Sequence, residues 1–215
     1  MSKDVSPFHN LIFDQIVNNN ASLSYCVRWD NNEKLSKTTA SKFEAMLSRQ
    51  FKLWNHWLIG YDCWPYEKID IKIVGFFAVR DASLLDWSDD SLGKIYEGVL
   101  DDDEIPKCPD ECYKHQGQQA NADTSACEGQ PFDMSLWPSE DVPGQNVDGT
   151  GGDWGQRVEV KAMLEIMDDE QMMTLAHEIG HGFGLPDFYG PLDKSSTFPA
   201  ALMDQSETLT PADGG

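Results

Sequence analysis

The sequence His177-Glu178-Ile179-Gly180-His181-Gly182-Phe183-Gly184-Leu185-Pro186-Asp187-Phe188-Tyr189 decides how this chain of 215 residues is interpreted. It places two imidazoles four residues apart and a carboxylate directly after the first. On an α-helix, positions i and i+4 lie on one face, so His177 and His181 can bind the same metal ion. A catalytic zinc site has three protein ligands and one open position for water. Glu178 lies where it can take a proton from such a water, as in H-E-x-x-H motifs.

The residues after His181 predict a turn that brings a third ligand back to the metal. Gly184 stands where the helix must end, and glycine tolerates the left-handed conformation of a sharp turn. Leu185-Pro186 then redirects the chain and can bring Asp187 towards the two histidines. Two core histidines without a metal would leave this turn unexplained. The sequence therefore predicts a zinc site with His177, His181 and Asp187 as ligands.

The motif His177-Glu178-x-x-His181-x-x-Gly184-x-x-Asp187 resembles the signature of the metzincin zinc proteases. Most metzincins have a third histidine where this chain has aspartate, and the aspartate variant is similar to snapalysin-like secreted bacterial and fungal zinc peptidases. Ala201-Leu202-Met203-Asp204 resembles the Met-turn, which implies that Met203 lies beneath the zinc and is not a ligand. The resemblance further implies that Tyr189 stabilises the oxyanion and that Glu178 is the general base.

Hydrophobic periodicity predicts an α+β fold. The resemblance implies a metzincin-like, twisted mixed sheet with a long backing helix, an active-site helix and a short lower lobe. We expect a flexible tail at 1–22 and one zinc metalloprotease domain at 23–215, with an upper lobe at about 23–184 and a lower lobe at about 185–215. Strands are expected at 24–29, at 69–79 with a bulge at Gly75, at 94–100, and at 156–165, the last near a sheet edge. A helix is expected over about 43–61, capped by Thr39 or Ser41, and a second helix, capped by Asp168 or Asp169, carries the motif. A further helix is expected to start at Thr210-Pro211-Ala212-Asp213.

The charge balance excludes several classes of partner. The chain has 37 acidic and 16 basic residues, a net charge of −21, and this field repels nucleic acid and anionic membranes. No run of eighteen apolar residues is present, so no segment is predicted to span a membrane. The acidic run Asp101-Asp102-Asp103-Glu104 could bind structural calcium or be a solvated charge run. We expect a monomer that acts on protein or peptide substrates.

Five cysteines favour an oxidising compartment. Cys26, Cys63, Cys108, Cys112 and Cys127 follow no zinc-ribbon spacing, and three of them lie in a loop-like region that disulfides would stabilise. The first-choice pairing is Cys26–Cys63. The N-terminus has no apolar signal-peptide core, so the protein is either cytosolic or the mature form of a secreted protein that has been given a start methionine. The cysteines favour the secreted form.

A second function is compatible with the same motif. Zinc could be purely structural in a non-catalytic module that binds carbohydrate or protein through exposed tryptophans. Structural zinc sites are closed by four protein ligands, whereas the sequence offers three. The sequence therefore favours a zinc endopeptidase that hydrolyses peptide bonds through a zinc-bound water.

Overall fold

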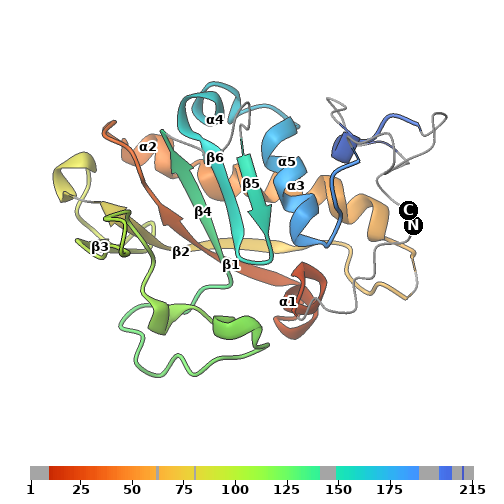
Figure 1. Cartoon of the computed structure of the whole chain (residues 1–215), viewed down its shortest axis with the longest axis horizontal. Helices are drawn as coiled ribbons and strands as arrows, with labels where there is room; N and C mark the ends of the chain where they lie inside the picture. The colour runs from red at the N-terminus through yellow and green to blue at the C-terminus, as the bar shows by residue number, and fades with distance from the viewer. Residues whose placement is uncertain are drawn as a thin grey trace.

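The computed structural model describes residues 10–61, 63–79, 81–140, 149–188, 199–204 and 210. These residues form an α+β fold in which a sheet is covered by helices on one face (Figure 1). The helices are α1 (Ile12–Asn18), α2 (Lys37–Ala40), α3 (Phe43–Leu58), α4 (Val160–Ile166) and α5 (Met173–Gly182), with short 3₁₀ turns η1 (Ala82–Leu84), η2 (Asp110–Cys112), η3 (Gln116–Gln118) and η4 (Leu202–Asp204). The strands are β1 (Ser22–Arg28), β2 (Asp70–Val79), β3 (Lys94–Glu97), β4 (Met134–Ser139), β5 (Gly149–Gly152) and β6 (Gly155–Glu159).

The sheet is mixed, as the sequence predicts. Its strand order is β3-β2-β1-β4-β6-β5, and all neighbouring strands are parallel except β5 and β6. The predicted bulge is present beside Gly75, because Tyr25 pairs with Ile73 while the next residue, Cys26, pairs with Gly75. The antiparallel strand β5 therefore ends the sheet on the side of α5 (Figure 1).

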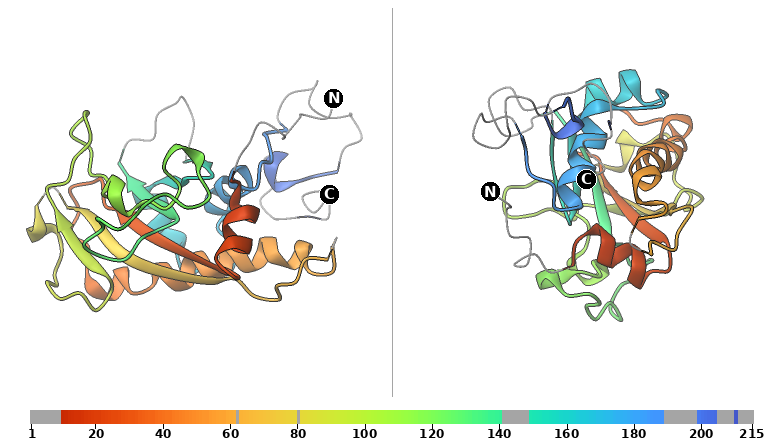
Figure 2. Two further views of the ribbon diagram at one scale, coloured as in Figure 1. Left: turned by 90° about the horizontal axis from the view of Figure 1, so that it is seen from below. Right: turned by 90° about the vertical axis from the view of Figure 1, so that its right-hand side faces the viewer.

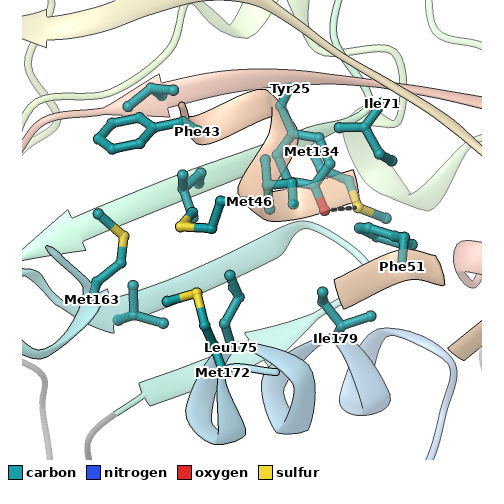
Figure 3. Close-up of a cluster of buried hydrophobic side chains, with 14 of the residues drawn as sticks. Tyr25, Phe43, Met46, Phe51, Ile71, Met134, Met163, Met172, Leu175 and Ile179 are labelled. Carbon is teal, nitrogen blue, oxygen red and sulfur yellow. Dashed lines mark hydrogen bonds between the residues drawn. The ribbon is translucent and has the colours of Figure 1, made fainter. Parts of the chain in front are cut away.

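The main core lies between the sheet and helices α3 and α5. Leu23, Tyr25 and Val27 alternate along β1 and are fully or almost fully buried on this face. Figure 3 shows side chains from β1, β4, α3 and α5 meeting there, with the Tyr25 hydroxyl 3.1 Å from the sulfur of Met134. The aromatic stripe of α3 thus belongs to the core, as predicted from its spacing.

The opposite face of the sheet is covered by the long connection between β3 and β4 (Figure 2). Two disulfides hold this connection, Cys26–Cys108 and Cys112–Cys127, while Cys63 is free and exposed. The prediction of disulfides is confirmed, but the Cys26–Cys63 pairing is wrong. Cys26 alternates with the core residues of β1 and so faces away from α3, whereas Cys63 follows the end of α3.

Removing the Cys26–Cys108 disulfide should strongly destabilise the protein. The bond joins residues 82 positions apart, so its loss frees a long loop in the unfolded chain. A Cys26→Ala/Cys108→Ala double variant should lose about 4–5 kcal/mol of unfolding free energy in guanidinium denaturation. Cys63→Ser is the control and should stay within about 0.5 kcal/mol of the parent. A double variant as stable as this control would contradict the expectation.

Asp133 links three parts of the chain from a position that is 1% exposed. Its carboxylate accepts hydrogen bonds from Asn19 after α1, from Ser24 on β1, and from Lys114 and His115 in the long connection. Burial alone would raise the pKa of Asp133. The hydrogen bond from His115, the charge of Lys114 and the Ser24 donors outweigh burial and lower this pKa to about 2.

This depressed pKa makes stability depend on acidity. Because the pKa is lower in the folded protein than in the unfolded chain, ionised Asp133 stabilises the fold above about pH 4. About 2 kcal/mol of this contribution should disappear as the pH falls towards 2. Thermal unfolding between pH 2 and 6 should therefore be less pH-dependent in Asp133→Asn than in the parent. Asp102→Asn, at an exposed position, should keep the parental slope, and an unchanged slope in Asp133→Asn would contradict the assignment.

Several boundaries differ from the sequence prediction. The proposed tail at 1–22 is wrong for its second half, because Ile12 and Ile16 of α1 are fully buried. The predicted strand at 156–165 ends at Glu159, whose side chain accepts from the amides of the next turn and starts α4. The prediction that this strand lies near a sheet edge is confirmed, since β6 is next to the edge strand β5. Val160 and Leu164 fit both the alternation of a strand and the four-residue spacing of a helix, so the sequence pattern did not show where the strand ends.

The helix caps also differ. Helix α5 begins at Met173, after Met172, whose backbone amide donates to the buried Gln50 side chain of α3. Asp168 instead bonds Lys42 at the surface, so neither predicted aspartate caps α5. Helix α3 starts after Lys42, which makes no side-chain cap, so neither Thr39 nor Ser41 caps it. Ser36 caps the short helix α2 that precedes it. No helix in the described part of the chain is long and apolar enough to cross a membrane. The predicted helix at Thr210-Pro211-Ala212-Asp213 lies outside the described residues apart from Thr210.

Candidate metal centre

Helix α5 carries both motif histidines and ends in the predicted glycine turn. Gly184 has a φ of +87°, in the left-handed region. The amide of Gly184 donates to the carbonyl of His181 at 2.9 Å, and the amide of Leu185 donates to that of Gly180 at 3.1 Å. These two bonds form a Schellman motif, which needs a left-handed residue at this position and favours glycine. The turn reverses the chain directly after the second histidine.

Asp187 returns to the histidines, so the three predicted ligands meet. Its Oδ1 lies 3.0 Å from Nε2 of His177 and 3.4 Å from Nε2 of His181. Two ligands on one tetrahedral zinc, each at about 2.0–2.1 Å, are separated by roughly 3.3 Å. The spacing of the three donor atoms therefore fits a shared zinc ion.

The other nitrogen of each imidazole is fixed by a backbone carbonyl. Nδ1 of His177 lies 3.0 Å from the Leu202 carbonyl oxygen, and Nδ1 of His181 lies 2.8 Å from that of Leu185. A carbonyl can only accept, so each Nδ1 must carry the proton. In the neutral ring each Nε2 then presents a lone pair to the carboxylate of Asp187. Three acceptors that converge in this way can hold a cation between them, and the carbonyls fix the imidazoles as backbone carbonyls do in metal sites.

Glu178 is buried beside this cluster. Among the described residues, Glu178 groups with the two histidines, because one donor atom each of His177, Glu178 and His181 lies within 4.8 Å of the others. Burial, and secondly the negative charge of Asp187, raise the pKa of Glu178 to about 8. Its Oε2 is buried, has no hydrogen-bond partner in the described structure, and lies 3.9 Å from Nε2 of His181. Such an atom can accept a proton from a water held at the metal.

The glycines of β5 explain how Glu178 is held. A Cβ at Gly149 would lie 2.8 Å from both Cγ and Oε1 of Glu178, and one at Gly151 would lie 2.2 Å from the Glu178 carbonyl oxygen. Because real Cβ atoms do not approach backbone atoms this closely, β5 can lie against α5 only with glycine at 151, whereas a Cβ at 149 would displace the Glu178 side chain. The strand forms a wall beside the Glu178 carboxylate.

Met203 lies under the helix at the predicted Met-turn. It is fully buried in η4, and its sulfur would lie 2.6 Å from a Cβ placed on Gly180, between the two histidines. The Phe188 amide donates to the Met203 carbonyl, which connects the segment after Asp187 to η4. The same turn supplies the Leu202 carbonyl that orients His177.

The structure thus brings together His177, Glu178, His181 and Asp187, and places Met203 beside them. Tyr189, the predicted oxyanion donor, lies outside the described residues. Sequence reasoning did not identify Gly149 and Gly151, or the carbonyls of Leu185 and Leu202, as parts of the site. The glycine spacing of 149, 151 and 152 was the available signal, since alternate glycines allow a strand to approach a helix.

The predicted calcium site gains no support from the geometry. Oδ1 of Asp101 accepts the amides of Asp103 and Ile105, and its Oδ2 lies 3.3 Å from the Arg28 guanidinium. The carboxylate of Asp101 is therefore engaged within the protein.

No family model, curated protein or solved structure matches this chain. Its function is therefore inferred from the residues and geometry of the metal centre.

Proposed function

We propose that this chain is a zinc-dependent endopeptidase with a metzincin-like fold. The observation that carries the proposal is the convergence of three acceptor atoms, Nε2 of His177, Nε2 of His181 and Oδ1 of Asp187, beside the buried carboxylate of Glu178. The order of a strand, a long helix, further strands, an edge strand and the motif helix is compatible with such a fold.

The three acceptors would hold the zinc ion, which when bound supplies a Lewis acid for the attacking water and the scissile carbonyl. Glu178 accepts the proton of the attacking water at Oε2 and passes it to the leaving amine. Because the Glu178 carboxylate is buried, bulk water cannot exchange with the proton that this carboxylate carries. Tyr189 remains the predicted donor to the oxyanion.

The edge for substrate binding is proposed on β5. Strand β6 is less suitable, because Gln156, Arg157 and Val158 are paired with β4 on one side and with β5 on the other. Among the described strands β5 pairs only with β6, so its outer backbone groups can pair with an extended peptide. Such a peptide would lie beside Glu178, because Gly149 contacts that side chain. Peptides and unfolded protein segments are therefore the proposed substrates.

Secretion is part of the proposal. The two disulfides support an oxidising compartment such as the extracellular space.

The direct test is hydrolysis of casein or gelatin by the whole protein. Activity should disappear when a chelator removes the metal and return when one equivalent of zinc is added. Metal content should be measured on the same samples. A protein that contains zinc and is folded but cleaves neither substrate would overturn the proposal.

The alternative of a tryptophan-based binding module is not supported by an exposed platform. Trp29, Trp54 and Trp87 are buried in the core. Both faces of Trp137 are occupied, since the guanidiniums of Arg28 and Arg157 lie 3.7 and 3.8 Å from its centroid. The geometry thus favours the peptidase.

Gly149→Ala should separate the role of Glu178 from metal binding. The new methyl group would displace the Glu178 carboxylate, and a shift of about 1 Å can cost roughly 10²-fold in rate. We expect kcat to fall by that amount while zinc content stays at one equivalent. Thr150→Ala, at the exposed neighbouring position, is the matched control and should keep the parental kcat. Parental kcat in Gly149→Ala would show that the strand does not position the carboxylate.

A further inference from the structure

The turn between α1 and β1 contains an acceptor sequence that the proposed peptidase does not use. Asn20-Ala21-Ser22 has the form N-x-S with a residue other than proline in the middle, and this form occurs once in the chain. In secreted proteins it is the acceptor for N-linked glycans, which need an exposed asparagine.

The structure places Asn20 where a glycan fits. The residue is exposed, and its side-chain amide forms no hydrogen bond to the described part of the chain. Asn20 and Ala21 have φ values of 53° and 65°, so the chain turns sharply between α1 and β1. Disulfides form in the same compartment as N-glycans, and this chain has two.

Asparagine also suits the backbone conformation at this position. Asn20 follows the C-cap of α1, and the amides of Asn20 and Ala21 close a Schellman motif on the carbonyls of Val17 and Ile16. Glycine is the residue preferred there, and asparagine is the second choice. The hydroxyl of Ser22 also takes part in the turn, since it donates to the carbonyl of Asn19 at 2.9 Å.

We infer that Asn20 is an N-glycosylation site. Nδ2 of Asn20 attacks the anomeric carbon of an N-acetylhexosamine carried on a polyprenyl diphosphate. A carbon–nitrogen bond forms, the anomeric carbon–oxygen bond breaks, the polyprenyl diphosphate leaves with the bonding electrons, and Nδ2 gives one proton to the transferase. No oxidation or reduction takes place.

The glycan would lie away from the metal centre. Ile12, at the other end of α1, lies against Gly182 of α5, whereas Asn19 is bonded to Asp133 beneath the long connection. Helix α1 therefore separates the turn from α5, and loss of the glycan should leave peptide hydrolysis unchanged.

The test is expression of the full chain through a eukaryotic secretory pathway. The secreted protein should exceed its polypeptide mass, and peptide-N-glycosidase should return it to that mass and convert Asn20 to aspartate in peptide maps. Asn20→Gly keeps the left-handed turn and Ser22→Ala keeps the asparagine, and both should lose the added mass. Ser22→Thr preserves the acceptor form and Asn18→Gln changes an exposed neighbour outside it, so both should retain the glycan.

Two results would overturn the inference. One is a secreted parent with both disulfides formed but no added mass. The other is a glycan that persists in Asn20→Gly, which would place it elsewhere in the chain.

Discussion

Glu178→Gln should reduce kcat for peptide hydrolysis by roughly 10²–10⁴-fold, the usual contribution of a general acid–base group. The amide keeps the size of the side chain, so it still fits between α5 and Gly149. It cannot accept the proton of the attacking water. Zinc content and thermal stability should therefore remain close to those of the parent.

The control is Glu165→Gln, an exposed carboxylate on α4. It should keep full activity and so exclude a general effect of removing one negative charge. If Glu178→Gln lost zinc together with activity, Glu178 would be a fourth ligand and the site a closed, structural one. Full activity in Glu178→Gln would overturn its role as general base.

Asp187→Ala should abolish zinc retention and activity together. Mutating a residue that only hydrogen-bonds a metal ligand lowers the metal affinity by about 10–100-fold. Removing a direct ligand should therefore lower the zinc affinity by more. In this variant the two histidines would still point towards the metal position, but only two ligand atoms would remain in place of three. Zinc affinity measured against a competing chelator gives the comparison.

Asp187→His tests the ligand role more closely. Imidazole is also a zinc ligand, so this variant should bind zinc more tightly than Asp187→Ala even if activity is reduced. Asp204→Ala, in η4 but without a predicted ligand role, should retain zinc. Equal zinc affinity in the parent and Asp187→Ala would show that Asp187 does not bind the metal.

The parts of the site that the sequence predicted depend on short-range chemistry. Histidines four residues apart meet on one face of any helix, and Gly184 has the conformation that its place after the helix required. Asp187 follows within one turn, so little of the fold is needed to bring it to the histidines. The long helix α3 and strands β1, β2 and β3 were also predicted, because each has a clear hydrophobic period.

The parts that were missed depend on contacts between distant segments. Strands β4 and β5 lie in a region without sustained periodicity. Strand β5 has three glycines among its four residues, and it is a strand because β6 and α5 hold it there. The disulfide partner of Cys26 depends on which face of the sheet it occupies, and that face is set by the long connection.

The contact between β5 and α5 has a consequence for engineering. No intervening layer separates the strand that would receive a substrate from the helix that would perform the chemistry, since Gly151 lies against the Glu178 backbone and Gly149 against its side chain. A displacement of the strand would be transmitted to the base without being absorbed by intervening atoms. Docking and proton transfer would then be mechanically coupled. A new specificity loop grafted beside this strand would preserve turnover only if both glycines kept their register with the helix.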